Sequence, residues 1–239
     1  MKRRLALAAF GLAALLGSAT AAVAANGSAL VFGANGKLGS EMVKALLDRN
    51  IDVTAFVRPS SDRSLLNGLP IKYVEGDVRN KADIDKAFAS GKFTLAVNAI
   101  ARRSRQEFGL YESSQNSMTA AAKATGVKQM IFFSSVGVGS SRFLYSDKAY
   151  ANFKATMTER EAAENTLIAS GVPYTIVRTG GVLDGNIATG KAYLSEKPIL
   201  GATTRVDLAQ ITVACVGADF CKNKIFHAGD DTQKVPGGE

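Results

Sequence analysis

Three glycines spaced three residues apart, Gly33, Gly36 and Gly39, follow an apolar run over residues 29–32. In such a loop the first glycine lets a buried strand turn sharply, and the second lets the backbone close on a pyrophosphate. The third lets the next helix pack tightly on the sheet. The helix predicted over residues 38–49 would direct its N-terminal N–H groups at the phosphates. The spacing predicts a dinucleotide-binding loop, with a plain strand–turn–helix as the alternative.

An arginine follows the second predicted strand, where dinucleotide-binding proteins select between two cofactors. Arg58 comes after Gly39 at close to the expected spacing of about 20 residues, and no acid stands at this strand end. NAD-selective sites place Asp or Glu here for the ribose 2′-hydroxyl, whereas the planar fork of an arginine suits a 2′-phosphate. Lys37, inside the glycine loop, would add a second positive charge. The pattern favours NADP(H), with NAD(H) as the alternative.

Apolar, β-branched runs alternate with helical patterns along nearly the whole chain. The predicted strands cover residues 29–32, 52–57, 71–74, 93–97, 130–133, 174–177 and 225–227. The predicted helices cover residues 38–49, 81–89, 111–125, 156–170 and 206–216. This alternation predicts an α/β fold with a doubly wound, mostly parallel sheet and helices on both faces. Residues 180–201 have weak periodicity and are expected to form a small substrate-side region.

Small or polar clusters follow the third, fourth and fifth predicted strands. They contain Asp77 and Val78, then Ala99, then Ser134 and Ser135. Ligands bind parallel sheets at the carboxyl ends of the strands, so these clusters would lie where adenine, ribose and nicotinamide are held in turn. Any one of them alone would be an ordinary loop.

Together with the glycine loop, these clusters resemble the short-chain dehydrogenase/reductase superfamily, and specifically its atypical, NmrA-like NAD(P)H-binding branch. The matching motifs are residues 33–39, Val57-Arg58-Pro59, Gly76-Asp77-Val78, Phe133-Ser134-Ser135-Val136-Gly137, residues 170–178 and Val206-Asp207-Leu208-Ala209. The resemblance implies a Rossmann-type fold, with Asp77 contacting adenine and Ser134 or Ser135 near the nicotinamide. The cofactor-binding residues expected are Gly33, Asn35, Gly36, Lys37, Leu38, Gly39, Arg58, Asp77, Val78, Ala99 and Ser134.

The superfamily uses a tyrosine and a lysine four residues apart on one helical face for catalysis. Tyr150 and Lys154 have this spacing. The lysine would lower the pKa of the tyrosine and orient the nicotinamide ribose, so that the phenol exchanges the substrate proton. Ser134 or Ser135 would polarise the substrate oxygen.

A second alignment removes this dyad. The Ala163-Glu164 pair, which in relatives follows the lysine by three and four residues, here points back to Arg160 and puts Thr156 in the tyrosine position. Thr179 also stands where relatives carry proline. The leading hypothesis is an NADP(H)-dependent oxidoreductase of a small organic, carbonyl- or quinone-like substrate. The alternative is a non-catalytic NADP(H)-binding protein that senses redox state or binds a partner in assembly.

The first 25 residues have the pattern of a secretory signal peptide. Lys2-Arg3-Arg4 precede an apolar stretch over residues 5–16, and small residues end at Ala24-Ala25. A membrane-spanning helix needs about 20 apolar residues, so no stable membrane anchor is expected. Cleavage would leave residues 26–239 as a single NAD(P)-binding domain, exported to the periplasm or to an organelle lumen.

Composition limits the remaining functions. The 239-residue chain is 46% hydrophobic and carries a net charge of +8, which suits one globular domain with a sizeable core. The charge is dispersed, so a small molecule is expected as ligand, nucleic acid is not, and a protein partner stays open. A single histidine and no Cys or His cluster argue against a metal site. Cys215 and Cys221 are interpreted as two small, partly buried apolar residues, with a disulfide as the alternative.

Overall fold

The computed structural model describes residues 27–102, 108–184 and 187–235. Its strands are β1 (Ser28–Phe32), β2 (Asp52–Val57), β3 (Lys72–Glu75), β4 (Leu95–Asn98), β5 (Gln129–Ser135), β6 (Tyr174–Thr179), β7 (Gly181–Leu183), β8 (Tyr193–Ser195), β9 (Ala202–Thr204) and β10 (Lys224–Gly229). Its α-helices are α1 (Lys37–Leu47), α2 (Lys81–Ala89), α3 (Leu110–Thr125), α4 (Asp147–Ala151), α5 (Lys154–Ala169) and α6 (Arg205–Val213). Short 3₁₀ helices lie at Ser64–Leu66, Gly139–Leu144 and Asp219–Cys221.

Eight strands form the central sheet in the order β3-β2-β1-β4-β5-β6-β10-β8. Neighbouring strands pair in parallel, with the exception of β8, which is antiparallel to β10. This confirms the predicted doubly wound, mostly parallel α/β sheet. The strand order reverses between β1 and β4, and sheets of this kind bind their ligands at such a switch point.

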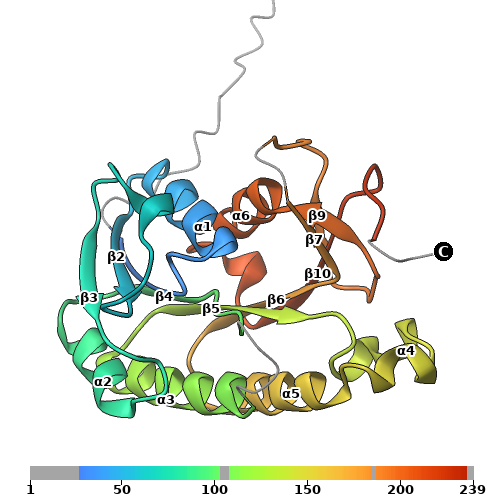
Figure 1. Ribbon diagram of the computed structural model, residues 1–239, viewed down its shortest axis with the longest axis horizontal. Helices are drawn as coiled ribbons and strands as arrows, with labels where there is room; N and C mark the ends of the chain where they lie inside the picture. The colour runs from blue at the N-terminus through green and yellow to red at the C-terminus, as the bar shows by residue number, and fades with distance from the viewer. Residues whose placement is uncertain (1–26, 103–107, 185–186, 236–239) are drawn as a thin grey trace, which may run out of the picture.

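Helices cover both faces of the sheet (Figure 1). α1 and α6 lie side by side on one face, over a core that includes Val31 and Leu208. α2, α3 and α5 form the layer on the other face, over Phe32 and Leu167. Successive residues of a strand point to opposite faces, so Val31 and Phe32 enter different cores. Strands buried on both faces are apolar throughout, which is why the sequence shows them as continuous runs.

The glycine loop has the backbone geometry that its spacing predicts. Gly33 has φ +76°, and a Cβ there would lie 2.7 Å from the carbonyl oxygen of Ala99. A Cβ on Gly39 would lie 2.0 Å from the carbonyl oxygen of Gly33. The sharp turn at Gly33 and the close packing of the helix at Gly39 are therefore confirmed. Both depend on the absence of a side chain.

Residues 180–204 contain elements that the sequence pattern does not predict. β7 and β9 pair in parallel as a separate two-stranded sheet, and β8 extends the central sheet through β10. Each of the three strands has three residues, too few to produce a recognisable alternation. The short helix α4 is missed for the same reason.

The cysteine interpretation is wrong in one respect. Cys215 and Cys221 are both buried, as expected, but they form a disulfide. The chain turns back after α6 through the 3₁₀ helix at Asp219–Cys221, which brings the two Cα atoms to 5.4 Å. This separation lies within the range that a disulfide requires. The path of the turn sets the separation, and the spacing of the two cysteines in the sequence does not reveal that path.

Candidate functional site

A cavity of about 420 Å³ lies at the carboxyl ends of β1, β2, β4 and β5. The sequence-predicted residues that line it are Gly33, Asn35, Gly36, Lys37, Leu38, Arg58, Asp77, Val78, Ala99 and Ser134. The predicted residues that are absent from its lining are Gly39, Ser135, Tyr150 and Lys154. Segments far apart in the sequence meet here because parallel strands end at one edge of the sheet.

The glycine loop brings the start of α1 to this cavity. Gly36 precedes the helix, and the first turn has neither a side-chain cap nor an acidic residue. N–H groups in the first turn of a helix have no partner within the helix. They and the positive end of the helix dipole are therefore available to an anion. The loop has the form of a phosphate site.

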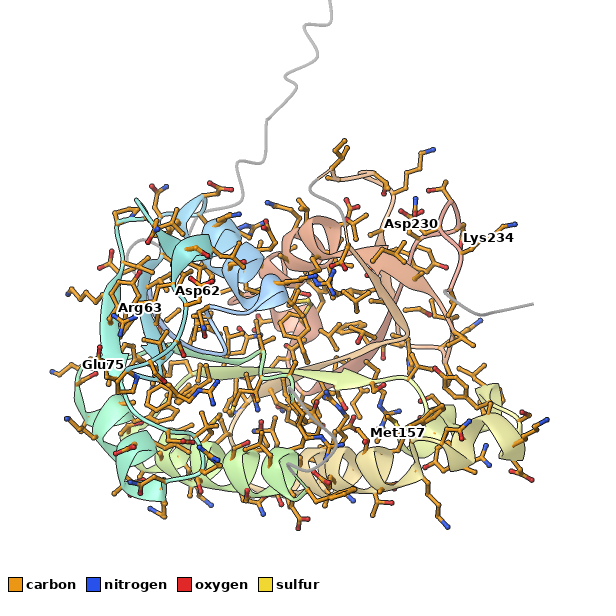
Figure 2. The ribbon with its side chains drawn as sticks, in the orientation of Figure 1. Asp62, Arg63, Glu75, Met157, Asp230 and Lys234 are labelled. Carbon is orange, nitrogen blue, oxygen red and sulfur yellow. A yellow bond between two sulfur atoms is a disulfide. The ribbon has the colours of Figure 1, made fainter. Side chains whose placement is uncertain are left out.

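Two polar side chains of the loop bind protein groups. Lys37 Nζ lies 3.0 Å from Asp184 Oδ1, and Arg205 pairs with the same carboxylate. The hydrogen bond from Lys37 and the charge of Arg205 hold the pKa of Asp184 below its usual value. Lys37, the second positive charge that we expected beside Arg58, thus joins the loop to the chain after β7. Asn35 Nδ2 donates to the carbonyl of Asp62 at 3.0 Å. Asp62 lies in the loop between β2 and β3 (Figure 2).

Arg58 lines the cavity after β2, and its side chain makes no hydrogen bond or ion pair with the described residues. The nearby acid, Asp77, is already occupied. It accepts a hydrogen bond from Arg79 Nε at 2.9 Å, and this bond, more than the charge of Arg58, holds the pKa of Asp77 below its usual value. The donors of Arg58 therefore remain available to a ligand at this end of the cavity.

Ser134 presents a polar atom without a protein partner at the end of the cavity formed by β5. The residue is 2% exposed, it lines the cavity, and its Oγ has no hydrogen-bond partner among the described residues. A buried hydroxyl without a partner is costly, so the atom is suited to a ligand. Ser135 differs, because its Oγ donates to the carbonyl of Val136 at 3.1 Å. Of the two predicted serines, the structure brings Ser134 to the cavity.

Arg160 lines the cavity beside Ser134. Its Nη1 donates to the carbonyl of Phe133 at 2.9 Å, and its Cζ lies 3.9 Å from the centre of the Tyr111 ring. Burial lowers the pKa of Arg160. The second sequence alignment, which placed Arg160 in the position of the lysine, is the one whose basic residue reaches the cavity.

Tyr150 and Lys154 do not share a helical face, and this expectation is wrong. α4 ends at Ala151 and α5 begins at Lys154, with Phe153 in a non-helical conformation between them. The Tyr150 ring lies under Arg142, at 3.9 Å from its Cζ, and Lys154 is exposed. Residues four apart lie on one face only within a continuous helix. The break between α4 and α5 therefore removes the alignment of the Tyr150 and Lys154 side chains that their spacing predicts.

The sequence pattern does not predict a buried ion pair that links α5 to β6. Arg178 donates through Nε to Glu164 Oε1 at 3.1 Å and through Nη2 to Oε2 at 2.7 Å. Arg178 is the register partner of Ser134 in β6, and Glu164 lies one turn after Arg160 in α5. The pair therefore joins the helix that carries Arg160 to the strand beside Ser134. No spacing in the sequence indicates it, because the partners are 14 positions apart and lie in two different elements, α5 and β6.

No helix in the described ranges is long and apolar enough to span a membrane. No group of three or more His, Cys, Asp or Glu side chains in those ranges is placed to hold a metal ion. The predicted signal peptide lies outside the described residues.

Comparison with known proteins places this geometry among cofactor-binding folds. A family model described as NAD(P)H-binding matches residues 33–219. The solved structure of ChuY, an anaerobillin reductase of Escherichia coli O157:H7, superposes with a TM-score of 0.76, at 26% identity over 87% of this chain and 98% of that one.

Two curated proteins from photosynthetic organisms are also similar. The chloroplast protein At2g37660 of Arabidopsis thaliana is 28% identical over an alignment of 231 residues, which covers 87% of this chain and 70% of that protein. Photosystem II assembly factor Ycf39 of Cyanophora paradoxa is 25% identical over 211 residues, and the chain spans 62% of its length. The family match covers the glycine loop, the strand-end clusters and α5, which confirms the resemblance to the atypical, NmrA-like branch. This chain belongs to the NAD(P)H-binding family.

Proposed function

We propose that this protein is an NADP(H)-dependent oxidoreductase that reduces or oxidises a small organic, carbonyl- or quinone-like substrate. The observation that carries the proposal is the buried, unpartnered Ser134 Oγ in the cavity wall. It is a hydrogen-bond donor held in place before a ligand arrives, which is the arrangement that stabilises charge developing on a substrate oxygen.

The residues of the cavity fit the cofactor along its length. The glycine loop and the start of α1 would hold the pyrophosphate, and Arg58 would meet the 2′-phosphate with its planar fork. Ala99 and Val78 would line the adenosine and ribose. A bound NADPH would supply the hydride for the reaction.

The chain's own residues then act on the substrate oxygen. Ser134 Oγ would donate a hydrogen bond to that oxygen and stabilise the negative charge that develops there. The guanidinium of Arg160, beside Ser134, would hold the substrate in the cavity. The proton that completes the reduction would come from solvent, because the cavity lining includes no tyrosine among the described residues. Ser134 and Arg160 thus take the place of the tyrosine–lysine dyad.

The proposal is tested by titrating the purified protein with NADPH and then adding a generic quinone or aldehyde. We expect tight NADPH binding and loss of NADPH absorbance on addition of substrate. Tight binding without turnover over a broad substrate set would instead favour the second candidate, a non-catalytic NADP(H)-binding protein that acts with a partner. Two observations support that candidate: Tyr150 lies away from the cavity, and Ycf39 is named as an assembly factor.

The cofactor preference should depend on Arg58. Replacing Arg58 with alanine is expected to weaken NADPH binding by about 1–3 kcal/mol, the value of a charge-assisted hydrogen bond, and to leave NADH affinity nearly unchanged. Titration calorimetry with both cofactors measures this, and Arg49→Ala, an exposed arginine at the end of α1, is the matched control. Equal affinity of the wild-type protein for NADPH and NADH would contradict the assignment.

We also propose export to an oxidising compartment. The disulfide between Cys215 and Cys221 supports it, because disulfides persist mainly outside the reducing cytosol. Protein recovered from its native host should begin near Asn26 in N-terminal sequencing. A chain that keeps Met1 and fractionates with the cytosol would contradict export.

A further inference from the structure

The cationic side chains that line the cavity are Lys37, Arg58, Arg79, Arg160 and Arg205. Three of them are paired with Asp77 or Asp184. Within the described part of the chain, Arg58 and Arg160 have no carboxylate at ion-pair distance. These two side chains leave positive charge in the cavity wall for a ligand to neutralise.

The two unpaired arginines lie at different ends of the cavity. Arg58 follows β2, and Arg160 binds the carbonyl of Phe133 in β5. In the sheet order β2-β1-β4-β5, β5 is the third strand from β2. Neighbouring strands are about 4.8 Å apart, so these strands are roughly 14 Å apart. β5 is also roughly 10 Å from β1, whose end carries the glycine loop. Arg160 therefore lies away from both phosphate positions and beside Ser134.

Packing holds the Arg160 guanidinium in one place. One of its faces rests on the Tyr111 ring, and the same ring lies 4.9 Å from the Cζ of Arg102. Arg102 is neutralised by Glu159, with Nη1 3.0 Å from Oε1. Burial lowers the pKa of Arg160, while Tyr111 and the charge of Glu164 act in the opposite direction. Glu164 is hydrogen-bonded to Arg178, so an anionic ligand would give Arg160 a counter-ion of its own.

Ile100, Leu110, Phe133 and Val182 give the cavity an apolar part, and Thr179 also lines it, with its Oγ1 donating to the carbonyl of Ser134 at 3.2 Å. A ligand there meets apolar side chains, one buried hydroxyl without a partner and one guanidinium. Carboxylates match a guanidinium through two parallel hydrogen bonds. We propose, on the basis of the oxidoreductase function above, that the substrate is a largely apolar carbonyl compound bearing a carboxylate, which Arg160 binds while Ser134 binds the carbonyl oxygen.

The test compares two probes that differ in charge and little else, 2-naphthoate and 2-naphthamide. Each is titrated calorimetrically into full-length protein saturated with NADPH. We expect 2-naphthoate to bind at least about tenfold more tightly, the order of a charge-assisted contact. Arg160→Gln should abolish this preference and keep the 2-naphthamide affinity. Arg160→Lys should keep part of it, because the charge remains but the fork is lost. Lys148→Gln, which removes an exposed charge from α4, should keep it fully.

Three outcomes would overturn the inference. Equal affinity of the wild-type protein for the two probes removes its basis. A preference that survives in Arg160→Gln assigns the carboxylate to another group. Weaker NADPH binding in Arg160→Gln with an unchanged probe preference assigns Arg160 to a cofactor phosphate. Failure of the wild-type protein to bind NADPH contradicts the proposed function itself, whereas tight NADPH binding without a probe preference contradicts this inference alone.

Discussion

Replacing Ser134 with alanine is expected to lower kcat/KM for NADPH-dependent carbonyl or quinone reduction by about 10²–10³-fold, the usual effect of removing one donor to a developing oxyanion. NADPH affinity and stability should change little. The Ser134 Oγ has no hydrogen-bond partner among the described residues, so its removal leaves no other group unsatisfied. Steady-state kinetics together with calorimetric titration of NADPH measure the two effects separately.

Two variants serve as controls for Ser134→Ala. Ser135→Ala removes a hydroxyl that bonds to the backbone outside the cavity lining, so its rate should stay close to that of the wild-type protein. Tyr150→Phe should be nearly silent as well, because the phenol lies under Arg142 and not in the cavity wall. A collapse of turnover in Tyr150→Phe, with Ser134→Ala unaffected, would restore the tyrosine–lysine dyad as the catalytic pair.

Replacing Glu164 with alanine is expected to reduce the free energy of unfolding by about 3–5 kcal/mol, because it leaves a buried guanidinium without its counter-ion. The side chains of Arg178 and Glu164 are 5% and 2% exposed, so water cannot take over the lost interaction. Urea-induced unfolding, followed by circular dichroism, gives the change in free energy directly.

The matched control is Glu161→Ala on the same helix, where the side chain is exposed and a change within about 0.5 kcal/mol is expected. The double variant Glu164→Leu with Arg178→Met should recover much of the loss, since an apolar pair of similar volume replaces both charges. A loss below about 1 kcal/mol in Glu164→Ala would mean that the pair is solvated and does not anchor α5.

Most of the fold could be predicted because its strands are buried on both faces and therefore appear as uninterrupted apolar runs. The strand ends were also predictable where a small or polar cluster follows the run, as at Asp77, Ala99 and Ser134. Prediction failed for β7, β8, β9 and α4, each of three to five residues. Such short elements form because neighbouring segments offer hydrogen bonds, and periodicity does not record this.

The sequence by itself determined the glycine loop. Gly33 has φ +76°, a local conformation that favours glycine, and a Cβ on Gly39 would collide with the carbonyl oxygen of Gly33 in the same loop. Arg58 was likewise predictable, because its place is set by the length of one strand–helix–strand unit.

The tertiary structure alone decided which of the predicted polar groups line the cavity and which of them have protein partners. Lys37 is engaged by Asp184, far away in the sequence, and Tyr150 is turned aside by the break between α4 and α5. Ser134 is left without a hydrogen-bond partner while Ser135, next to it, is satisfied. Contacts of this kind depend on where separate elements pack. The spacing of residues within one segment does not tell which side chain from another segment will contact them.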